Sequence, residues 1–377
     1  MKNGILFLIV LVTLISCNQE PEGYTINGTL TGGLEEGTNV FLKRIGDNNQ
    51  PIEVDTATIT DGKFQFKGVS TTPELHYIFV DKIKGYTAVI LENGTIDFSA
   101  QKDSLGFASI EGTLQNDVFA DYLEKSRALS QQARSIQDDL QKATQNGSPE
   151  ATIIALRDEM QELQEEYKGF ELEYIKSHPN ALISALLLDR AVASKAIDSE
   201  EIKTMYEALS PEIMNSKPGK RVLEGIEKLK KSEEAKKNTS VGAKAPDFSG
   251  PNPEGKTIAL RDVMGKVTLV DFWAAWCRPC RAENPNVVAV YNKYHEKGLN
   301  IVGVSLDRTA EAWKKAIADD RLEWNHISNI AYFDDEIAKL YNVDAIPAAF
   351  LLDENGVIVA KNLRGPALEE KVAELLN

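Results

Sequence analysis

The stretch that decides the fold of this chain is residues 267–280, VTLVDFWAAWCRPC. Its first part, Val267 to Ala274, is a nearly continuous apolar run, which is typical of a buried strand in a parallel or mixed sheet. Cys277 and Cys280 follow this run directly, and a helical pattern then continues to about Glu296. We therefore expect the two cysteines at a strand-to-helix junction, with Cys277 at the N-terminus of the helix.

This position favours nucleophilic chemistry at the Cys277 sulfur. The unpaired N–H groups of a first helical turn and the helix dipole stabilise a thiolate, and Arg278 adds a fixed positive charge. Both effects predict that the pKa of Cys277 lies below the value of about 8.5 for a free cysteine. Cys280 lies one helical turn further on. We expect an exposed Cys277 that attacks a substrate disulfide and a buried Cys280 that resolves the mixed disulfide.

Three other roles for the cysteine pair fit less well. A structural disulfide that closes so small a loop removes little entropy from the unfolded chain. A zinc site needs two more ligands, and the four histidines are scattered along the sequence. Covalent haem attachment needs a histidine directly after the second cysteine, where Arg281 stands. We therefore expect neither a metal nor a cofactor.

The motif resembles the active site of thioredoxin-like proteins. Val270 to Ala274, followed by Trp276-Cys277-Arg278-Pro279-Cys280, matches the active-site strand and motif of that family. The resemblance implies a redox-active Cys277–Cys280 disulfide. It also implies that Asp271 is a buried carboxylate behind the second cysteine, which helps to move the proton of Cys280. Trp276, Arg278 and Pro279 are then supporting residues of the active site.

The residues beyond the motif fit the same family. Pro285 lies where the active-site helix of the family is kinked, and Ile346-Pro347 matches the cis-proline loop, which lies beside the disulfide and pairs with the substrate backbone. The turn Asp353-Glu354-Asn355-Gly356 predicts a hairpin between the last two strands. The remaining elements of an α/β thioredoxin fold are expected at Leu299–Leu306, Ala348–Leu352, Val357–Ala360 and Ala367–Leu376.

The resemblance is strongest to the TlpA/ResA-like branch, which includes redoxins related to the AhpC/TSA proteins. Ala245-Pro246-Asp247-Phe248 and Glu283 carry it, and it covers residues 241–377. It implies that Glu283 lies near the active-site cavity and tunes proton transfer or substrate choice; a solvated helix carboxylate is the alternative. The usual role of the branch is to reduce disulfides in the cell envelope, including those of apocytochrome c, with electrons from a membrane donor.

Two other functions remain open. Peroxiredoxins share the motif at Ala245 to Phe248, but they pair their peroxidatic cysteine with an upstream threonine and proline, whereas Ala274-Ala275-Trp276 precedes Cys277 here. The non-enzymatic alternative is an envelope binding or scaffold lipoprotein with a minor redox activity. The sequence does not decide the direction of electron flow.

The N-terminus is expected to be a targeting segment. Residues 1–16 combine Lys2 with a short apolar run, as a signal peptide does, and the run is too short to span a membrane. Leu14-Ile15-Ser16-Cys17 resembles the lipobox of bacterial lipoproteins, which implies cleavage before Cys17 and lipidation of its sulfur. Residues 17–23 then form a tether, and Asn18 favours the outer over the inner membrane. We expect a lipid-anchored, periplasm-facing protein.

Residues 24–112 are expected to form a small all-β domain. Short β-branched or aromatic runs alternate with glycine-containing turns such as Asp61-Gly62, which predicts a small antiparallel sheet or sandwich. The region contains no catalytic constellation. It resembles the uncharacterised β-rich domain that precedes thioredoxin-like domains in some envelope lipoproteins.

Residues 113–238 are expected to be helical. Apolar residues recur at heptad spacing from Leu129 to Leu140 and from Leu156 to Tyr174, which predicts two antiparallel helices joined at Asn146-Gly147-Ser148-Pro149. Gly147 is expected to end the first helix and Ser148 to cap the second. The apolar seam closes either within one chain or between the two chains of a homodimer. Asn238-Thr239-Ser240 is expected to be a polar linker.

Length and charge agree with a multi-domain protein that does not bind nucleic acid. The chain has 377 residues, enough for two or three domains. Its formal net charge is −15, and nucleic-acid binding needs clustered lysine and arginine. The charge itself does not identify a partner; the redox motif and the family resemblance imply the thiols and disulfides of envelope proteins.

Overall fold

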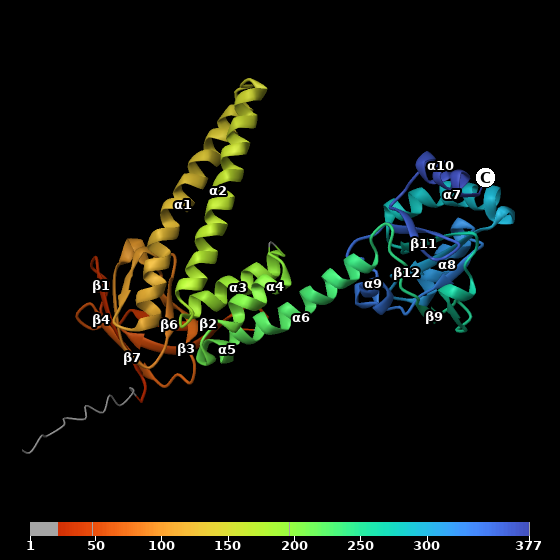
Figure 1. Ribbon diagram of the computed structural model, residues 1–377. Helices are drawn as coiled ribbons and strands as arrows, with labels where there is room; N and C mark the ends of the chain where they lie inside the picture. The colour runs from red at the N-terminus through yellow and green to blue at the C-terminus, as the bar shows by residue number, and fades with distance from the viewer. Residues whose placement is uncertain (1–21, 47, 196, 377) are drawn as a thin grey trace, which may run out of the picture. The chain divides into compact units, whose positions relative to one another are not determined.

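A computed structural model describes residues 22–46, 48–195 and 197–376 of the protein. The expected signal peptide and Cys17 lie outside these residues. The chain divides into two compact units, of which the first ends at Ile226 and the second begins at Glu227. The β-rich region and the helical region up to Ile226 thus belong to one unit. Figure 1 shows the elements of each unit.

The N-terminal unit begins with eight strands, and a short helix η1 (Lys102–Phe107) precedes the last of them. The strands are β1 (Tyr24–Thr31), β2 (Asn39–Ile45), β3 (Pro51–Thr58), β4 (Lys63–Gly68), β5 (Glu74–Val80), β6 (Thr87–Leu91), β7 (Gly94–Gln101) and β8 (Ser109–Glu111). They form two four-stranded sheets with the orders β4-β1-β7-β8 and β3-β2-β5-β6.

These two sheets share one core, so the all-β expectation is confirmed in the form of a sandwich. Alternate residues of strands such as β1 and β4 point inward, and Ile26 from one sheet and Leu42 from the other are fully buried in the same apolar cluster. The expectation of wholly antiparallel pairing is wrong, because β1 and β7 are parallel. The turn at Asp61-Gly62 is confirmed: both residues have positive φ, as a tight two-residue hairpin turn requires.

The helical hairpin follows the sandwich as α1 (Leu114–Gln145) and α2 (Glu150–Ser177). Gly147, with φ of 63°, ends α1 as expected. Ser148 does not cap α2, because its N–H donates to the carbonyl of Ala143 at 2.9 Å and so completes the C-terminal cap of α1. Pro149, in an extended conformation, occupies the N-cap position of α2 instead.

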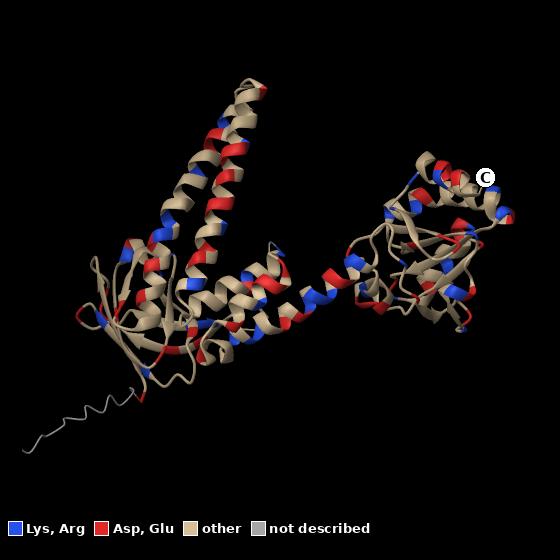
Figure 2. Cartoon of the chain, viewed as in Figure 1, with Lys and Arg blue, Asp and Glu red and all other residues tan. Residues whose placement is uncertain are grey.

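The apolar seam closes between α1 and α2 of one chain. Ile136 and Leu163 are each 4% exposed along the hairpin, and nearer the sandwich Tyr122 stacks on Phe170 with ring centroids 5.8 Å apart. Basic and acidic residues recur along the length of both helices (Figure 2). One chain is therefore sufficient to cover the heptad stripe.

Four more helices complete the region: α3 (Leu182–Ser194), α4 (Ser199–Glu207), α5 (Pro211–Asn215) and α6 (Lys217–Asn238). The boundary between the two units falls within α6. The expected polar linker after this helix is wrong, because Thr239 is fully buried and its hydroxyl donates to the carbonyl of Ala235 at 2.7 Å. These polar residues therefore close the helix.

The C-terminal unit is built on a five-stranded mixed sheet. Its strands are β11 (Val267–Trp273), β12 (Leu299–Ser305), β13 (Asn325–Ile327), β14 (Ala348–Asp353) and β15 (Ile358–Lys361), in the order β13-β12-β11-β14-β15. Central β11 pairs in parallel with β12 and antiparallel with β14. The strands β9 (Ser249–Pro251) and β10 (Thr257–Ala259) form a separate hairpin.

Helices cover both faces of this sheet. The helices α7 (Arg278–Tyr294), α8 (Ala310–Asp320) and α10 (Pro366–Leu376) share an apolar cluster with one face, and α9 (Glu336–Leu340) packs on the other. Short helices η2 (Leu260–Asp262), η3 (His295–Lys297) and η4 (Tyr332–Asp334) complete the unit. Every residue of β11 is buried, which accounts for its nearly continuous apolar sequence. This is the expected thioredoxin fold.

No helix among the described residues is both long enough and apolar enough to cross a bilayer.

Candidate active site

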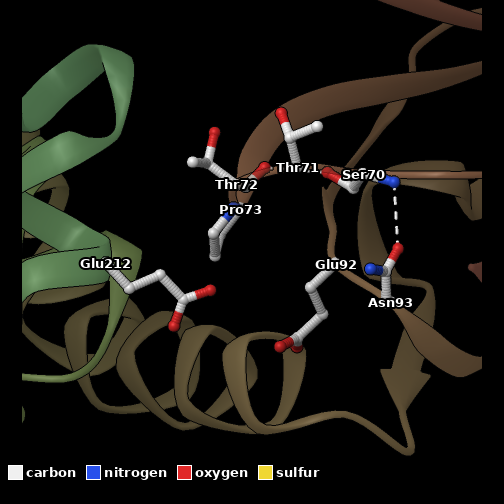
Figure 3. Close-up of a pocket in the computed structure, with 7 residues that line it drawn as sticks. All are labelled: Ser70, Thr71, Thr72, Pro73, Glu92, Asn93 and Glu212. Atoms are coloured by element: carbon white, nitrogen blue, oxygen red, sulfur yellow. Dashed lines mark hydrogen bonds between the residues drawn. The ribbon is translucent and has the colours of Figure 1, made fainter. Parts of the chain in front are cut away.

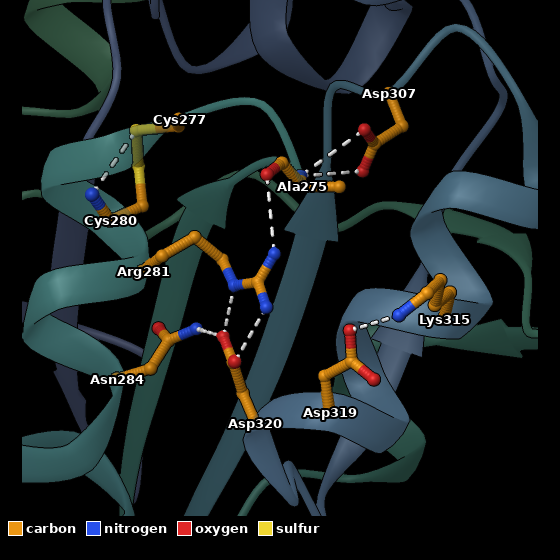
Figure 4. A network of polar contacts seen from close by, with 9 residues as sticks. All are labelled: Ala275, Cys277, Cys280, Arg281, Asn284, Asp307, Lys315, Asp319 and Asp320. Atoms are coloured by element: carbon orange, nitrogen blue, oxygen red, sulfur yellow. Dashed lines mark hydrogen bonds and ion pairs between the residues drawn. A yellow bond between two sulfur atoms is a disulfide. The ribbon is translucent and has the colours of Figure 1, made fainter.

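The cysteine pair lies where β11 ends and α7 begins. Cys277 and Cys280 form a disulfide with Cα atoms 5.3 Å apart. Cys277 is the N-cap residue of α7, and its sulfur accepts a hydrogen bond from the backbone N–H of Cys280 at 3.2 Å (Figure 4). Pro279 stands in the first turn, where its missing N–H costs no helical hydrogen bond. The predicted strand-to-helix junction is confirmed.

The expected contrast between an exposed Cys277 and a buried Cys280 is absent from this disulfide form. Each of the two residues is only 3% exposed, because both belong to the apolar cluster between the sheet and α7. The residues around them are more accessible, and Trp276 is 45% exposed. The two sulfurs therefore differ in their position on the helix and not in their exposure.

Asp271 occupies the middle of β11, on the same face of the sheet as the cysteines. The opposite residues of the neighbouring strands are Gly303 and Ala349, and the space above Gly303 is taken by the side chains of His326 and Trp273. Burial raises the pKa of Asp271 to about 6; the charge of Arg364 opposes this rise, and that of Glu283 adds to it. Asp271 is therefore a carboxyl group that titrates close to neutral pH.

Glu283 connects α7 to the loop before α10. Its Oε1 accepts hydrogen bonds from the backbone N–H of Gly365 at 2.8 Å and from Nδ2 of Asn286 at 2.9 Å. Gly365 has a φ of 53°, a conformation that suits glycine. The Glu283 carboxylate thus holds this loop beside Asp271. The alternative expectation, that Glu283 is a solvated carboxylate on the helix surface, is therefore wrong.

The loop before β14 lies at the same end of the sheet as the disulfide. The Ile346–Pro347 peptide bond is cis, as the resemblance implied. Ile346 packs against the apolar cluster that includes both cysteines. The structure thus brings Pro347 and the cysteine pair to one end of the sheet. Pro285 lies inside α7, also as expected.

A polar network fixes the loop between β11 and Cys277, and sequence reasoning missed it. The N–H of Ala275 donates to the two carboxylate oxygens of Asp307 at 3.1 and 3.2 Å, while its carbonyl accepts from Arg281 at 3.3 Å (Figure 4). Arg281 also pairs with Asp320 on α8, and Asn284 donates to the same carboxylate at 2.6 Å. The peptide group of Ala275 is therefore held from both sides.

One sequence signal could have indicated part of this network. Asp307 comes directly after Leu306, at the carboxyl end of the strand next to β11, where polar side chains meet the active-site loop. Asp307 is 1% exposed, and the Ser305 hydroxyl also donates to it at 2.8 Å. Asp320 has no such signal, because its contact with Arg281 depends on how α8 packs against α7.

The N-terminal unit contains a separate polar cavity of about 300 Å³. The loop from Ser70 to Pro73 lines it together with Glu92, Asn93 and Glu212, and both carboxylates point into it (Figure 3). Burial raises the pKa of Glu92, and the charge of Glu212 adds to the rise. Glu92 also accepts the backbone N–H of Gln115 at 2.7 Å at the start of α1. This contact gives Glu92 a structural role.

Two family models match separate parts of the chain. Residues 241–361 match the model of the AhpC/TSA family. Residues 24–119 match a domain of unknown function, DUF4369. The chain thus combines a redox-family domain with an N-terminal β-rich domain of unassigned role.

Individual relatives match the C-terminal unit. The thiol-disulfide oxidoreductase ResA of Bacillus thuringiensis subsp. konkukian is 34% identical over 136 residues, which are 36% of this chain and 76% of the relative. ResA of Bacillus subtilis is 28% identical over 142 residues, or 38% of this chain and 77% of the relative. The thioredoxin domain of a thiol-disulfide oxidoreductase from Bacteroides vulgatus is 39% identical, with a TM-score of 0.35; the match covers 37% of this chain and 99% of that domain.

Proposed function

The chain belongs to the ResA-like thiol-disulfide oxidoreductases, and from this membership we propose that Cys277 and Cys280 are the residues that exchange electrons with the cysteines of other proteins. The observation that carries the proposal is the disulfide itself, which lies at the N-terminus of α7. A thiolate at Cys277 is stabilised there by the helix dipole and by the N–H of Cys280.

The proposed reaction has two balanced steps. In the reduced protein, the Cys277 thiolate attacks a substrate disulfide, forms a mixed disulfide and releases one substrate thiolate. The Cys280 thiolate then attacks the Cys277 sulfur, restores the Cys277–Cys280 disulfide and releases the second substrate thiolate. Two electrons pass to the substrate, whose thiolates take up protons from solvent.

Asp271 is the proposed acceptor of the Cys280 proton. A carboxyl group with a pKa of about 6 is largely ionised at pH 7 and still basic enough to bind a proton. Glu283 and Arg364 act on it with opposite charges, so both are proposed to tune this transfer. Trp276, Arg278, Pro279 and Pro347 complete the proposed active site around the disulfide.

The biological setting is also a proposal. The resemblance to the TlpA/ResA-like branch supports a reductant in the cell envelope, with cytochrome c maturation as its process and a membrane protein as its electron donor. The resemblance of Leu14 to Cys17 to a lipobox supports a lipid anchor at Cys17. The reduction potential of the cysteine pair tests the direction of electron flow. A value near about −270 mV is expected of a reductant, and one near about −120 mV would indicate an oxidant.

A peroxidase is the second candidate, because the match to the AhpC/TSA family favours it. The residues before Cys277 disfavour peroxidase activity, because the upstream threonine and proline of peroxiredoxins are replaced here by Ala274-Ala275-Trp276. Turnover of hydrogen peroxide by the reduced protein separates the two functions. We expect slow, non-saturating thiol oxidation; rapid catalytic consumption would favour the peroxidase.

Trapping of partner proteins tests the proposed division of labour. Without the resolving thiol, attack proceeds and release stops, so Cys280→Ser is expected to accumulate mixed disulfides through Cys277, whereas Cys277→Ser should trap almost nothing. The double variant is the matched control. Equal trapping by both single variants would contradict the assignment. Apocytochrome c among the trapped proteins would support cytochrome maturation, and a broad set of proteins would indicate general disulfide reduction.

A further inference from the structure

An aromatic and cationic patch borders the disulfide, and only its Trp276 has been placed in the proposed active site so far. It consists of Trp276, Arg308, Tyr332 and Phe333, which we call the aromatic rim. Trp276 directly precedes Cys277, and its indole N–H donates to the carbonyl of Leu306 at 3.3 Å. The rim is therefore continuous with the reactive cysteine.

The three rings of the rim pack on one another at the surface. The ring centroids of Trp276 and Tyr332 are 5.2 Å apart, and those of Tyr332 and Phe333 are 4.7 Å apart. Trp276 remains 45% exposed, and Tyr332 and Phe333 are half-buried. Such rings offer rigid apolar area to a partner at a low cost in conformational entropy.

Arg308 supplies the charge of the rim. Its guanidinium group lies 3.9 Å from the centroid of the Tyr332 ring. Among the described residues, no carboxylate comes within ion-pair distance of Arg308 or of the exposed Arg278. The nearby exposed Asp334 is paired with Lys339 at 3.2 Å. In a chain with a net charge of −15, two arginines beside the disulfide are thus available to an anionic group.

Tyr332 and Phe333 of the rim lie in a loop before α9 whose backbone is held in an unfavourable conformation. Ile330 and Tyr332 have φ angles of 56° and 55°, a region that β-branched and bulky residues rarely adopt. Asp335, 1% exposed, holds the loop: its carboxylate accepts from Asn329 at 2.9 Å and from two N–H groups at the start of α9. Conformations of this kind persist where the surrounding structure enforces them, and they cluster at ligand-binding positions.

We propose that the aromatic rim docks the polypeptide segment next to the substrate cysteine and selects segments that carry an aromatic residue beside a carboxylate. The inference rests on the proposed function, since the substrate must be a protein disulfide. The rings would stack on the aromatic residue, and Arg308 would pair with the carboxylate. The residues of the rim thereby determine substrate choice without taking part in electron transfer.

The test uses the reduced full-length protein and three peptides, each with one cysteine in a mixed disulfide with 2-mercaptoethanol. Beside the cysteine, the first carries Phe and Asp, the second Phe and Lys, and the third Ala and Asp. Rate constants for the attack of Cys277 are divided by the rate constant with hydroxyethyl disulfide, which carries no peptide segment. This normalisation removes changes in the intrinsic reactivity of the thiol.

For the wild type we expect the Phe-Asp peptide to react fastest. Arg308→Gln should lower its advantage over the Phe-Lys peptide by about two- to five-fold, the effect of one exposed ion pair. Arg308→Glu should reverse the preference. Lys266→Gln is the matched control, because Lys266 is an exposed cation just before β11, at the end of the strand away from the cysteines.

The possible failures are distinguishable. If the reduced protein attacks neither the peptides nor hydroxyethyl disulfide, the proposed function fails. If it attacks all of them and Arg308→Glu leaves the Asp-to-Lys preference unchanged, the role of Arg308 is overturned. If the Phe-Asp and Ala-Asp peptides react equally fast, the aromatic part of the proposal is overturned.

Discussion

Replacement of Asp271 by asparagine gives the most direct test of the buried carboxyl group. Asp271→Asn keeps the size of the side chain and removes its ionisation. The folded protein holds the pKa of Asp271 at about 6, against an ordinary value of 3.8. Each pKa unit corresponds to about 1.4 kcal/mol, so ionisation of Asp271 destabilises the folded state by at most about 3 kcal/mol.

The sign and the pH window follow from these two pKa values. Below pH 3.8 the carboxyl group is protonated in both the folded and the unfolded state, so no penalty arises. Between pH 3.8 and about 6 the unfolded chain ionises first, and stability falls as the pH rises. Above that window the penalty is constant. We expect Asp271→Asn to stabilise the unit by about 0.5 kcal/mol at pH 4 and by up to about 3 kcal/mol at pH 8.

Urea unfolding of the oxidised full-length protein measures this difference. All four tryptophans of the chain lie in the C-terminal unit, so their fluorescence reports on that unit alone. Asp262→Asn serves as the control, because Asp262 is an exposed carboxylate in the same unit. The reasoning is refuted if Asp271→Asn has the same effect at pH 4 and pH 8, or if the control shows the same pH dependence.

Asp271→Asn should also slow disulfide exchange at the step in which Cys280 loses its proton. Exchange rates that match the wild type throughout pH 6–9 would count against the proton-accepting role, even if the stability result held. The two measurements therefore separate burial of the carboxyl group from its function.

Two further predictions concern other parts of the chain. Asp320→Asn should lower the free energy of unfolding of the C-terminal unit by about 1–3 kcal/mol, because it leaves Arg281 without its partly buried partner. The control Asp319→Asn breaks only an exposed i,i+4 pair with Lys315 and should lower it by less than about 0.5 kcal/mol. Equal effects of the two variants in urea unfolding would contradict a stabilising role of the Arg281–Asp320 pair. Cys17→Ala should prevent lipid attachment, which is measured by membrane fractionation and mass; recovery of the wild type in the soluble fraction after detergent-free lysis would contradict the lipobox.

The active-site elements were predictable because their signals are local. The apolar run that becomes β11 is long and nearly continuous. The turn at Asp353 to Gly356 is confirmed by the hydrogen bond from the N–H of Gly356 to the carbonyl of Asp353. Pro347 was different: its cis bond came from the family resemblance, since nothing in the local sequence distinguishes a cis from a trans proline.

The elements that sequence reasoning missed are short or contribute little to the core. Strand β3 is exposed or half-buried along its whole length, and its Ile52 and Val54, which alternate with Glu53 and Asp55, are 41% and 44% exposed. Strand β8 has only three residues. The contact between Arg281 and Asp320 joins positions 39 residues apart and depends on the packing of two helices. Such contacts have no local signature.

The parallel pair of β1 and β7 has a consequence for how the N-terminal unit folds. Asn27 and Asp97 lie side by side in this pair although they are 70 positions apart in the chain. Helices α1 and α2, in contrast, meet across a connection of only a few residues. Closing a long loop costs entropy before any contact forms. We therefore expect the helical hairpin to form early and the pairing of β1 with β7 to form later. During synthesis, β1 stays without one of its two neighbours until the ribosome has released Gln101.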